Sequence, residues 1–349
     1  MNVFYTIILF ISVNLISIGQ DIHFSQFFNT PLVTNPALTG FMKQDFRLNA
    51  IYRDQWRQAN ATFSTIAFGG DVNLSPPAIK GDKIGVGLLV FRDQMGSETF
   101  TNNSFYGSLS YIKTLDTQKR HKLSLGAQFG MVQKRVDYSS FYFGSQIIDY
   151  QVTPSAASGE NGITNSFSYF NMNAGLFYSY RLTPSTDIHA GISFFNLLKP
   201  KENFADATFE NDLNKLKNRG LIQIGARQLL IHRLYLRPEI MLMTQTRARN
   251  INMGAMLEYS LTPNPDHILL QAGVSTRFQD ALILYGGLKY HNLHIGISYD
   301  ATQSSLLDIR DSPEVKEHAR IGAFEIVLTY YGFLKRALPY QHTVPCKFF

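Results

Sequence analysis

The chain contains almost no cysteine, little charge and no long apolar run after its first residues. Cys346 is the single cysteine in 349 residues, which excludes a disulfide within the chain. Charged residues make up 17%, less than in most soluble enzymes, whereas aromatic residues make up 13%. Past residue 20 no run of about 18 apolar residues occurs, so no further helix of membrane-spanning length is predicted.

Sequence signatures of catalysis and of metal binding are missing too. His291 and His294 are three residues apart on a predicted strand, which places them on opposite faces and excludes a shared metal site. Residues 85–87 lack the third glycine and the following helix of a dinucleotide-binding loop, and no G-x-S-x-G nucleophile motif occurs. We therefore expect no enzyme activity, no metal and no cofactor.

The net charge of +6 does not indicate a nucleic-acid-binding protein. The basic residues are scattered through predicted strands and turns instead of forming one stripe. We interpret them as the solvated rim of a barrel, where they also meet anionic headgroups of outer-membrane lipid. No nucleic acid is expected as a partner.

From residue 45 to residue 332 apolar residues alternate with small or polar ones, in runs separated by turn-forming clusters. A bilayer accepts only helices and closed sheets, so this pattern predicts an antiparallel transmembrane β-barrel of about 14 strands. A soluble β-sandwich has the same period, but these strands are too many and too long for it. The predicted strands lie near residues 45–56, 61–74, 83–93, 103–115, 120–136, 166–182, 186–198, 218–230, 232–247, 249–261, 267–278, 280–290, 291–301 and 318–332.

Several charged residues are embedded in otherwise apolar strands. A charge that faces lipid near the membrane midplane costs about 2 to 4 kcal/mol, so these side chains are predicted to face the lumen. They are Arg227, Glu239, Glu258, Lys289 and Glu325.

The first 20 residues resemble a cleaved signal peptide. Residues 4–18 are apolar, and Ser17-Ile18-Gly19 places small residues at alternate positions before the predicted cleavage site at Gln20 or Asp21. Residues 1–5 carry no Lys or Arg, which leaves an N-terminal anchor helix as the alternative. We expect export to the outer membrane.

The links between predicted strands fall into two classes. Residues 247–249, 278–280 and 290–292 fit tight turns, which we expect on the periplasmic side. Residues 137–165, 199–217 and 302–317 form long excursions, where binding function is often found. Within the second excursion, residues 202–216 have the pattern of a short amphipathic helix or lid. A tail, residues 333–349, follows the last strand.

Residues 21–44 do not alternate and are predicted to be irregular, as a plug inside the barrel or a segment before it. This segment resembles the mature N-terminus of the PorP/SprF family of type IX secretion system membrane proteins. Residues 52–56, Y-R-D-Q-W, resemble the family's first strand end, and residues 322–330 and 345–348 resemble its closing strand and its C-P-R-F ending. The residues that carry the resemblance are Phe24, Ser25, Gln26, Phe27, Pro31, Asn35, Pro36 and Gly40, followed by Tyr52, Arg53, Gln55 and Trp56.

The resemblance implies a noncatalytic outer-membrane barrel that binds the C-terminal type IX secretion domain of a secreted protein, often a surface adhesin. It also implies contact with periplasmic and outer-membrane lipoproteins of the secretion or gliding machinery. The N-terminal segment then acts as a lumenal plug, as a contact for a periplasmic partner, or as both. Trp56 is either an interfacial anchor or packed inside the lumen. A channel or uptake barrel for a small or apolar solute is the alternative function.

Overall fold

The computed structural model describes part of the chain: residues 24–57, 62–79, 81–96, 99–138, 141–148, 151–159, 164–204, 215–262, 267–303 and 322–334. The predicted signal peptide, most of the predicted lid and Cys346 lie outside these residues. Within the described ranges, no helix combines the length and the apolar character that crossing a membrane requires.

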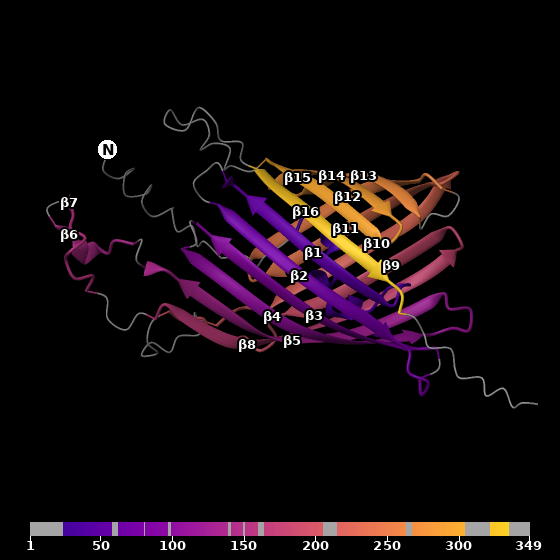
Figure 1. The fold of residues 1–349 in the computed structure, drawn as a ribbon, viewed down its shortest axis with the longest axis horizontal. Helices are drawn as coiled ribbons and strands as arrows, with labels where there is room; N and C mark the ends of the chain where they lie inside the picture. Colours follow the sequence, from indigo (N-terminus) through magenta and orange to yellow (C-terminus); the bar gives the residue numbers. More distant parts are fainter. Residues whose placement is uncertain are drawn as a thin grey trace, which may run out of the picture.

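The described strands form one closed antiparallel barrel of 14 strands, which confirms the predicted fold (Figure 1). Closure comes from β1, which pairs with both β2 and β16: Ile51 lies opposite Ala67 on one side and Val327 on the other. The strands are β1 (Phe46–Gln55), β2 (Phe63–Leu74), β3 (Lys83–Met95), β4 (Phe100–Thr114), β5 (His121–Val136), β8 (Ser166–Thr183), β9 (Thr186–Phe195), β10 (Arg219–Ile231), β11 (Leu234–Gln245), β12 (Ala248–Ser260), β13 (Ile268–Arg277), β14 (Ala281–Tyr290), β15 (Leu293–Thr302) and β16 (Gly322–Gly332).

The barrel wall is apolar outside and polar inside. Along β15, Ile295 and Ile297 are 37% and 47% exposed, whereas Ser298 and Asp300 are 3% and 2% exposed. A soluble sandwich buries its apolar face, so this inverted pattern is that of a wall that meets lipid. The alternation arises because successive side chains of a strand point to opposite faces.

The two ends of the barrel differ in their connections. We call the end where β5 leads to β8, β9 to β10 and β15 to β16 the loop end, and the end where β1 begins and β16 finishes the terminal end. The tight turns at 247–249 and 278–280 lie at the loop end, and only 290–292 lies at the terminal end. The prediction that all three turns lie on the same side of the membrane is therefore wrong. The direction of the preceding strand decides at which end of the barrel a turn lies, and the length of the link does not.

A small sheet of β6 (Ile147–Ile148) and β7 (Gln151–Val152) projects from the loop end, beyond the barrel (Figure 1). A 3-10 turn, η5 (Gly144–Gln146), precedes it. We call residues 141–159 the arm. Its apolar side chains are about half exposed: Phe141, Tyr142, Ile147, Ile148 and Val152.

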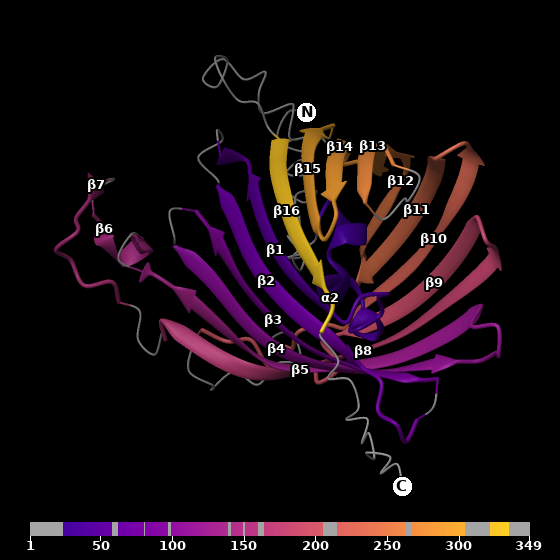
Figure 2. The same ribbon diagram turned by 45° about the vertical axis from the view of Figure 1, so that its right-hand side comes forward.

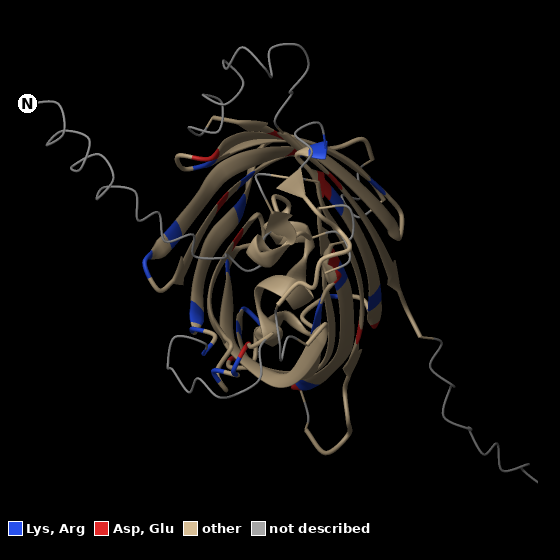
Figure 3. Ribbon diagram, turned by 90° about the vertical axis from the view of Figure 1, so that its left-hand side faces the viewer, with Lys and Arg blue, Asp and Glu red and all other residues tan. Residues whose placement is uncertain are grey.

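Residues 24–44 lie inside the barrel and are called the lumenal segment here (Figures 2 and 3). The segment contains η1 (Phe27–Asn29), α2 (Pro31–Thr34) and η2 (Pro36–Leu38). Its first residues contact the loop-end half of β16, and its last residues contact β2 and β4 near the terminal end. The segment therefore runs along the lumen from one end toward the other before β1 begins.

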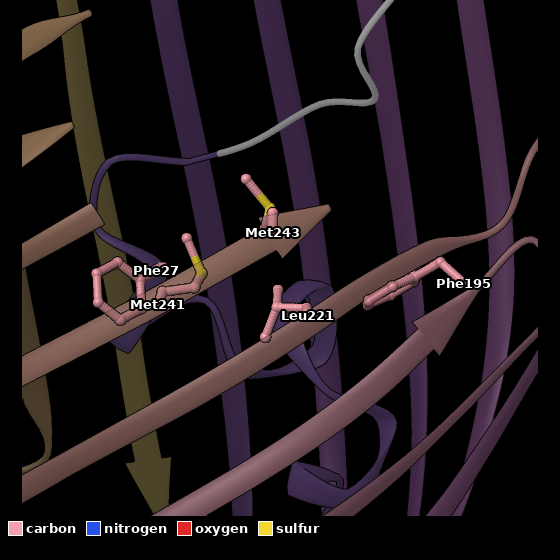
Figure 4. Close-up of a cluster of buried hydrophobic side chains, with 5 residues drawn as sticks. All are labelled: Phe27, Phe195, Leu221, Met241 and Met243. Atoms are coloured by element: carbon pink, nitrogen blue, oxygen red, sulfur yellow. The ribbon is translucent and has the colours of Figure 1, made fainter. Parts of the chain in front are cut away.

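Apolar side chains hold the lumenal segment against the wall at several places. Phe27 packs in a cluster with buried residues of β9, β10 and β11 (Figure 4). Phe24 packs on Ile51 and Val327, and Leu32 packs in a third cluster with residues of β3, β4 and β5. Burial of one large apolar side chain contributes about 1.5 to 3 kcal/mol, so these contacts favour the inserted position.

The wall approaches the middle of the lumenal segment most closely at glycine positions. A Cβ atom at Gly126 of β5 would overlap the backbone of Pro36, and one at Gly85 of β3 would overlap the backbone of Thr39. Asn35 fixes this contact, because its Nδ2 donates to the carbonyl of Leu176 in β8 at 3.1 Å. The Asn-Pro pair thus sits where the absence of wall side chains leaves room for it.

Candidate functional site

Four buried charged side chains meet inside the barrel near the loop end, and we call them the loop-end cluster. Arg53 donates to Asp300 and to Glu325, each at 3.0 Å, and Arg277 donates to Asp300 at 3.0 Å. These side chains come from β1, β13, β15 and β16, and none is more than 4% exposed. Their charges balance in number, as buried ions require.

The loop-end cluster grips the first described residues of the lumenal segment. The backbone N–H groups of Ser25 and Gln26 each donate to the Glu325 carboxylate at 2.9 Å. Ser25 Oγ donates to Asp300 at 2.6 Å and accepts from Arg53 and Arg277, both at 2.7 Å. Such charge-assisted bonds are roughly twice as strong as neutral ones, so this cluster is the main polar anchor at this end.

A second anchor lies near the terminal end. Arg47 and Asp71 form a buried pair with Nη2 and Oδ2 2.7 Å apart. The N–H of Gly40 donates to the same Asp71 carboxylate at 2.6 Å, and the carbonyl of Leu38 accepts from Arg47 at 3.1 Å. Gly40 has φ +66°, a conformation that glycine adopts without strain. The lumenal segment is therefore tied by charged groups at both of its ends.

Between the anchors, β10, β11 and β12 contribute a further charged group. Glu239 accepts from Arg237 at 2.8 Å, and its carboxylate lies 3.2 Å from His189 Nε2. Glu258 accepts from Arg227 at 2.6 Å. The guanidinium of Arg237 stands 5.3 Å above the ring of Phe28, which connects this group to the lumenal segment.

The structure brings together residues that appear in separate motifs of the sequence. Ser25, Gln26, Arg53 and Glu325 meet in one cluster, whereas Lys289 stands on the inward face of β14, away from it. In the strand-end motif, Arg53 alone bonds to the lumenal segment. Tyr52 donates to Asp54, Gln55 accepts from Arg53, and Trp56 packs edge-on against Phe63.

Sequence reasoning missed several charged partners. Each of them is a charged residue inside a predicted strand. Arg237 and Glu239 are two residues apart on the same strand, so the sequence indicates that their side chains point to the same face. Their partners are not readable from sequence, because the pairs join different strands. The missed residues are Arg47, Asp71, Arg237, Arg277 and Asp300.

The stretch from the lumenal segment to the last strand matches a known protein family. The family described as "Type IX secretion system membrane protein PorP/SprF" matches residues 16–330. The chain belongs to this family. The predicted family is thereby confirmed, and the PorP/SprF barrel is a membrane component of type IX secretion in the outer membrane.

Solved structures resemble the PorP/SprF barrel in fold. The Pseudomonas putida toluene transporter TodX is 11% identical with a TM-score of 0.52, and the match covers 88% of this chain and 94% of that one. The Ralstonia pickettii toluene transporter TbuX is 10% identical with a TM-score of 0.49 over the same shares. At such identities the likeness shows the barrel fold alone. A comparison with curated proteins finds no match.

Proposed function

We propose that this PorP/SprF barrel is a noncatalytic adaptor that holds the C-terminal domain of a secreted surface protein at its loop end. Lipoproteins of the secretion or gliding machinery then bind at the terminal end, on the periplasmic side. Membership of a secretion family supports the general role. The observation that carries the specific role is the arm, which exposes apolar residues beyond the barrel.

The arm has the chemistry of a docking surface for a β-domain. Tyr142 is 57% exposed and Ile147 is 52% exposed. The hairpin projects beyond the barrel, so contact with lipid does not account for these exposed apolar side chains, and an exposed apolar patch of this kind marks an interaction site. The hairpin pairs Ile147 with Val152 in a sheet of two strands, which leaves its outer edges open for another strand. Edge pairing supplies affinity through main-chain hydrogen bonds, and the exposed side chains supply specificity.

The anchored lumenal segment favours an adaptor over the alternative, a channel for a small or apolar solute. The segment occupies the lumen and is bonded by buried charges at both ends. An open pore requires the bonds between the segment and these charged groups to break, and each such bond contributes about 1.5 to 3 kcal/mol. Secretion adaptors need no open lumen, so the closed state is compatible with the proposed role.

Affinity purification from the native envelope tests the proposal. The tagged wild-type chain is expected to copurify a large secreted protein with a C-terminal β-domain, together with periplasmic lipoproteins. The double variant Ile147→Asp, Val152→Asp is expected to lose the secreted protein and to keep the lipoproteins. The matched control is Leu115→Asp, which changes an exposed apolar residue of the terminal end.

Two outcomes count against the adaptor. Equal recovery of the secreted protein with the double variant and with the control excludes the arm as the contact. A wild-type barrel that copurifies no secreted protein, together with a deletion strain that loses solute uptake and keeps all surface proteins, supports the channel instead.

A further inference from the structure

The lumenal segment leaves part of the loop end unfilled. A cavity of about 340 Å³ remains between the segment and strands β3, β4, β5 and β8. This volume is within the range of small-molecule sites, about 300 to 1,000 Å³. We propose that this cavity binds a small neutral amphiphile, meaning an apolar body that carries one uncharged hydrogen-bonding group.

The deep part of the cavity is apolar. Phe24 and Val33 of the lumenal segment line it, and Leu89 of β3 and Val132 of β5, each 3% exposed, line the facing wall. The ring of Phe91 is stacked on a tyrosine of β4, with ring centroids 6.1 Å apart. These side chains are held by packing around the cavity, so they form a preformed apolar surface for the body of a ligand.

Carboxamide groups form the polar part. Gln128, Asn171 and Asn173 line the cavity and are 1% to 4% exposed. Asn173 Nδ2 donates to Gln128 Oε1 at 2.8 Å, and Asn173 Oδ1 accepts the N–H of Asn196 at 3.1 Å. A carboxamide has two donor and two acceptor positions, so Asn173 retains one of each for a ligand. A hydroxyl or an amide has the donor and the acceptor that match these two positions.

The entrance lies at the loop end. Lys134 and Glu202 line the cavity and are paired with each other, and Tyr169 donates to the same carboxylate at 2.7 Å. Lys134 and Glu202 therefore neutralise each other. The short stretch around Glu202 is held by Phe204, which packs edge-on against Phe167 with centroids 4.5 Å apart.

Two more charged residues of opposite sign line the cavity, Asp93 and Arg219. Asp93 accepts from Thr65 Oγ1 at 2.6 Å. The guanidinium of Arg219 lies 4.2 Å from the centroid of the Phe195 ring. The lining thus carries no net charge, which favours an uncharged ligand.

The floor of the cavity distinguishes this site from a pore. Phe24 also belongs to a buried cluster with Ile51 and Val327, so the lumenal segment closes the cavity on the side away from the entrance. A ligand that enters from the loop end comes to rest on the segment. The site is thus a receptor site on the outer half of the barrel, independent of the arm.

Photolabelling tests the proposal with 4-azidobenzyl alcohol, a neutral aromatic probe with one hydroxyl group. The full-length barrel in lipid nanodiscs is irradiated with increasing probe, and labelled peptides are identified by mass spectrometry. We expect saturable labelling of β3, β4 and β5 at inward-facing residues, and at least tenfold less labelling there by 4-azidobenzoate, the anionic analogue.

Leu89→Trp fills the cavity and is expected to reduce saturable labelling at least tenfold. The matched control is Leu88→Trp on the same strand, where the side chain is 68% exposed on the lipid face. Val132→Phe serves as a second filling variant, and heat-shifted mobility on gels reports folding of each variant. Persistent saturable labelling in a folded filling variant overturns the proposal. If neither filling variant folds, the wild-type map decides, because labelling confined to lipid-facing residues also overturns it.

Discussion

Glu325→Gln removes one negative charge from the loop-end cluster without changing the volume of the side chain. The Glu325 carboxylate accepts the N–H groups of Ser25 and Gln26 and one bond from Arg53, and it is fully buried. A glutamine oxygen accepts one of the two N–H groups, whereas its NH₂ group faces the other. One charge-assisted bond, worth about 1.5 to 3 kcal/mol, is lost, and the other falls to the neutral value of about 1 kcal/mol.

The docked state of residues 24–26 should therefore lose about 3 kcal/mol. At 1.4 kcal/mol per factor of ten, amide exchange at Ser25 and Gln26 should accelerate roughly a hundredfold if they exchange by local opening. Exchange at residues 38–42 should change little, because the Arg47–Asp71 pair holds that end separately. Hydrogen exchange read by mass spectrometry on the barrel in nanodiscs measures both regions.

Glu258→Gln is the matched control for this experiment. Glu258 is also a buried carboxylate, but it bonds to Arg227 and Gln271 of the wall and not to the backbone of the lumenal segment. Unchanged exchange at Ser25 and Gln26 in Glu325→Gln would refute the anchoring role of Glu325. Equal acceleration in both variants would show general loosening of the barrel instead of local release.

Three further outcomes are expected. Asp71→Asn leaves Arg47 buried without its counter-charge, so exchange should rise selectively at residues 38–42, with a cost of about 3 to 5 kcal/mol. Gly126→Ala places a Cβ against the backbone of the lumenal segment and should make the segment protease-sensitive. Gly107→Ala should leave the protease resistance unchanged, because its added Cβ comes no closer than 4.0 Å to a neighbour. In the β4–β5 turn, backbone N–H donors lower the pKa of Asp116 below its ordinary value of 3.8. The stabilisation that the ionised carboxylate contributes is therefore fully present above pH 3.8. It is lost as the pH falls through the lower pKa that Asp116 has in the folded protein. Exchange of that turn, corrected for intrinsic rate, should stay slow at pH 4, and Asp116→Ala, which removes the acceptor of the His121 N–H, should abolish the protection at every pH.

The strands were predictable because each carries its own signal. In β15 the order from Ile295 to Asp300 alternates apolar and polar residues, and no knowledge of the partner strand is needed to assign the faces. The lumenal segment was predictable only as irregular, since Pro31, Pro36 and Gly40 exclude a regular strand without revealing where the segment lies. Its position inside the barrel depends on wall contacts such as that of Asn35 with β8.

The partners in the charged clusters were not predictable. Arg53 and Glu325 are 272 residues apart in sequence and meet because β1 pairs with β16 to close the barrel. Asp300 and Arg277 join the same cluster from β15 and β13, with β14 between them. A strand sequence reports which side a charge faces, but its height and its neighbour depend on register.

The two-residue period over residues 45–332 is therefore sufficient for the antiparallel barrel, because lipid outside and a polar lumen inside impose that period on every strand. The family motifs are likewise readable in order along the chain. Closure and register alone decide that Ser25 and Gln26 are gripped by Glu325, that the arm stands beyond the loop end, and that a cavity remains beside Phe24. The bonds of Ser25 and Gln26 to Glu325, for example, join residues 300 and 299 apart in sequence, which no local pattern encodes.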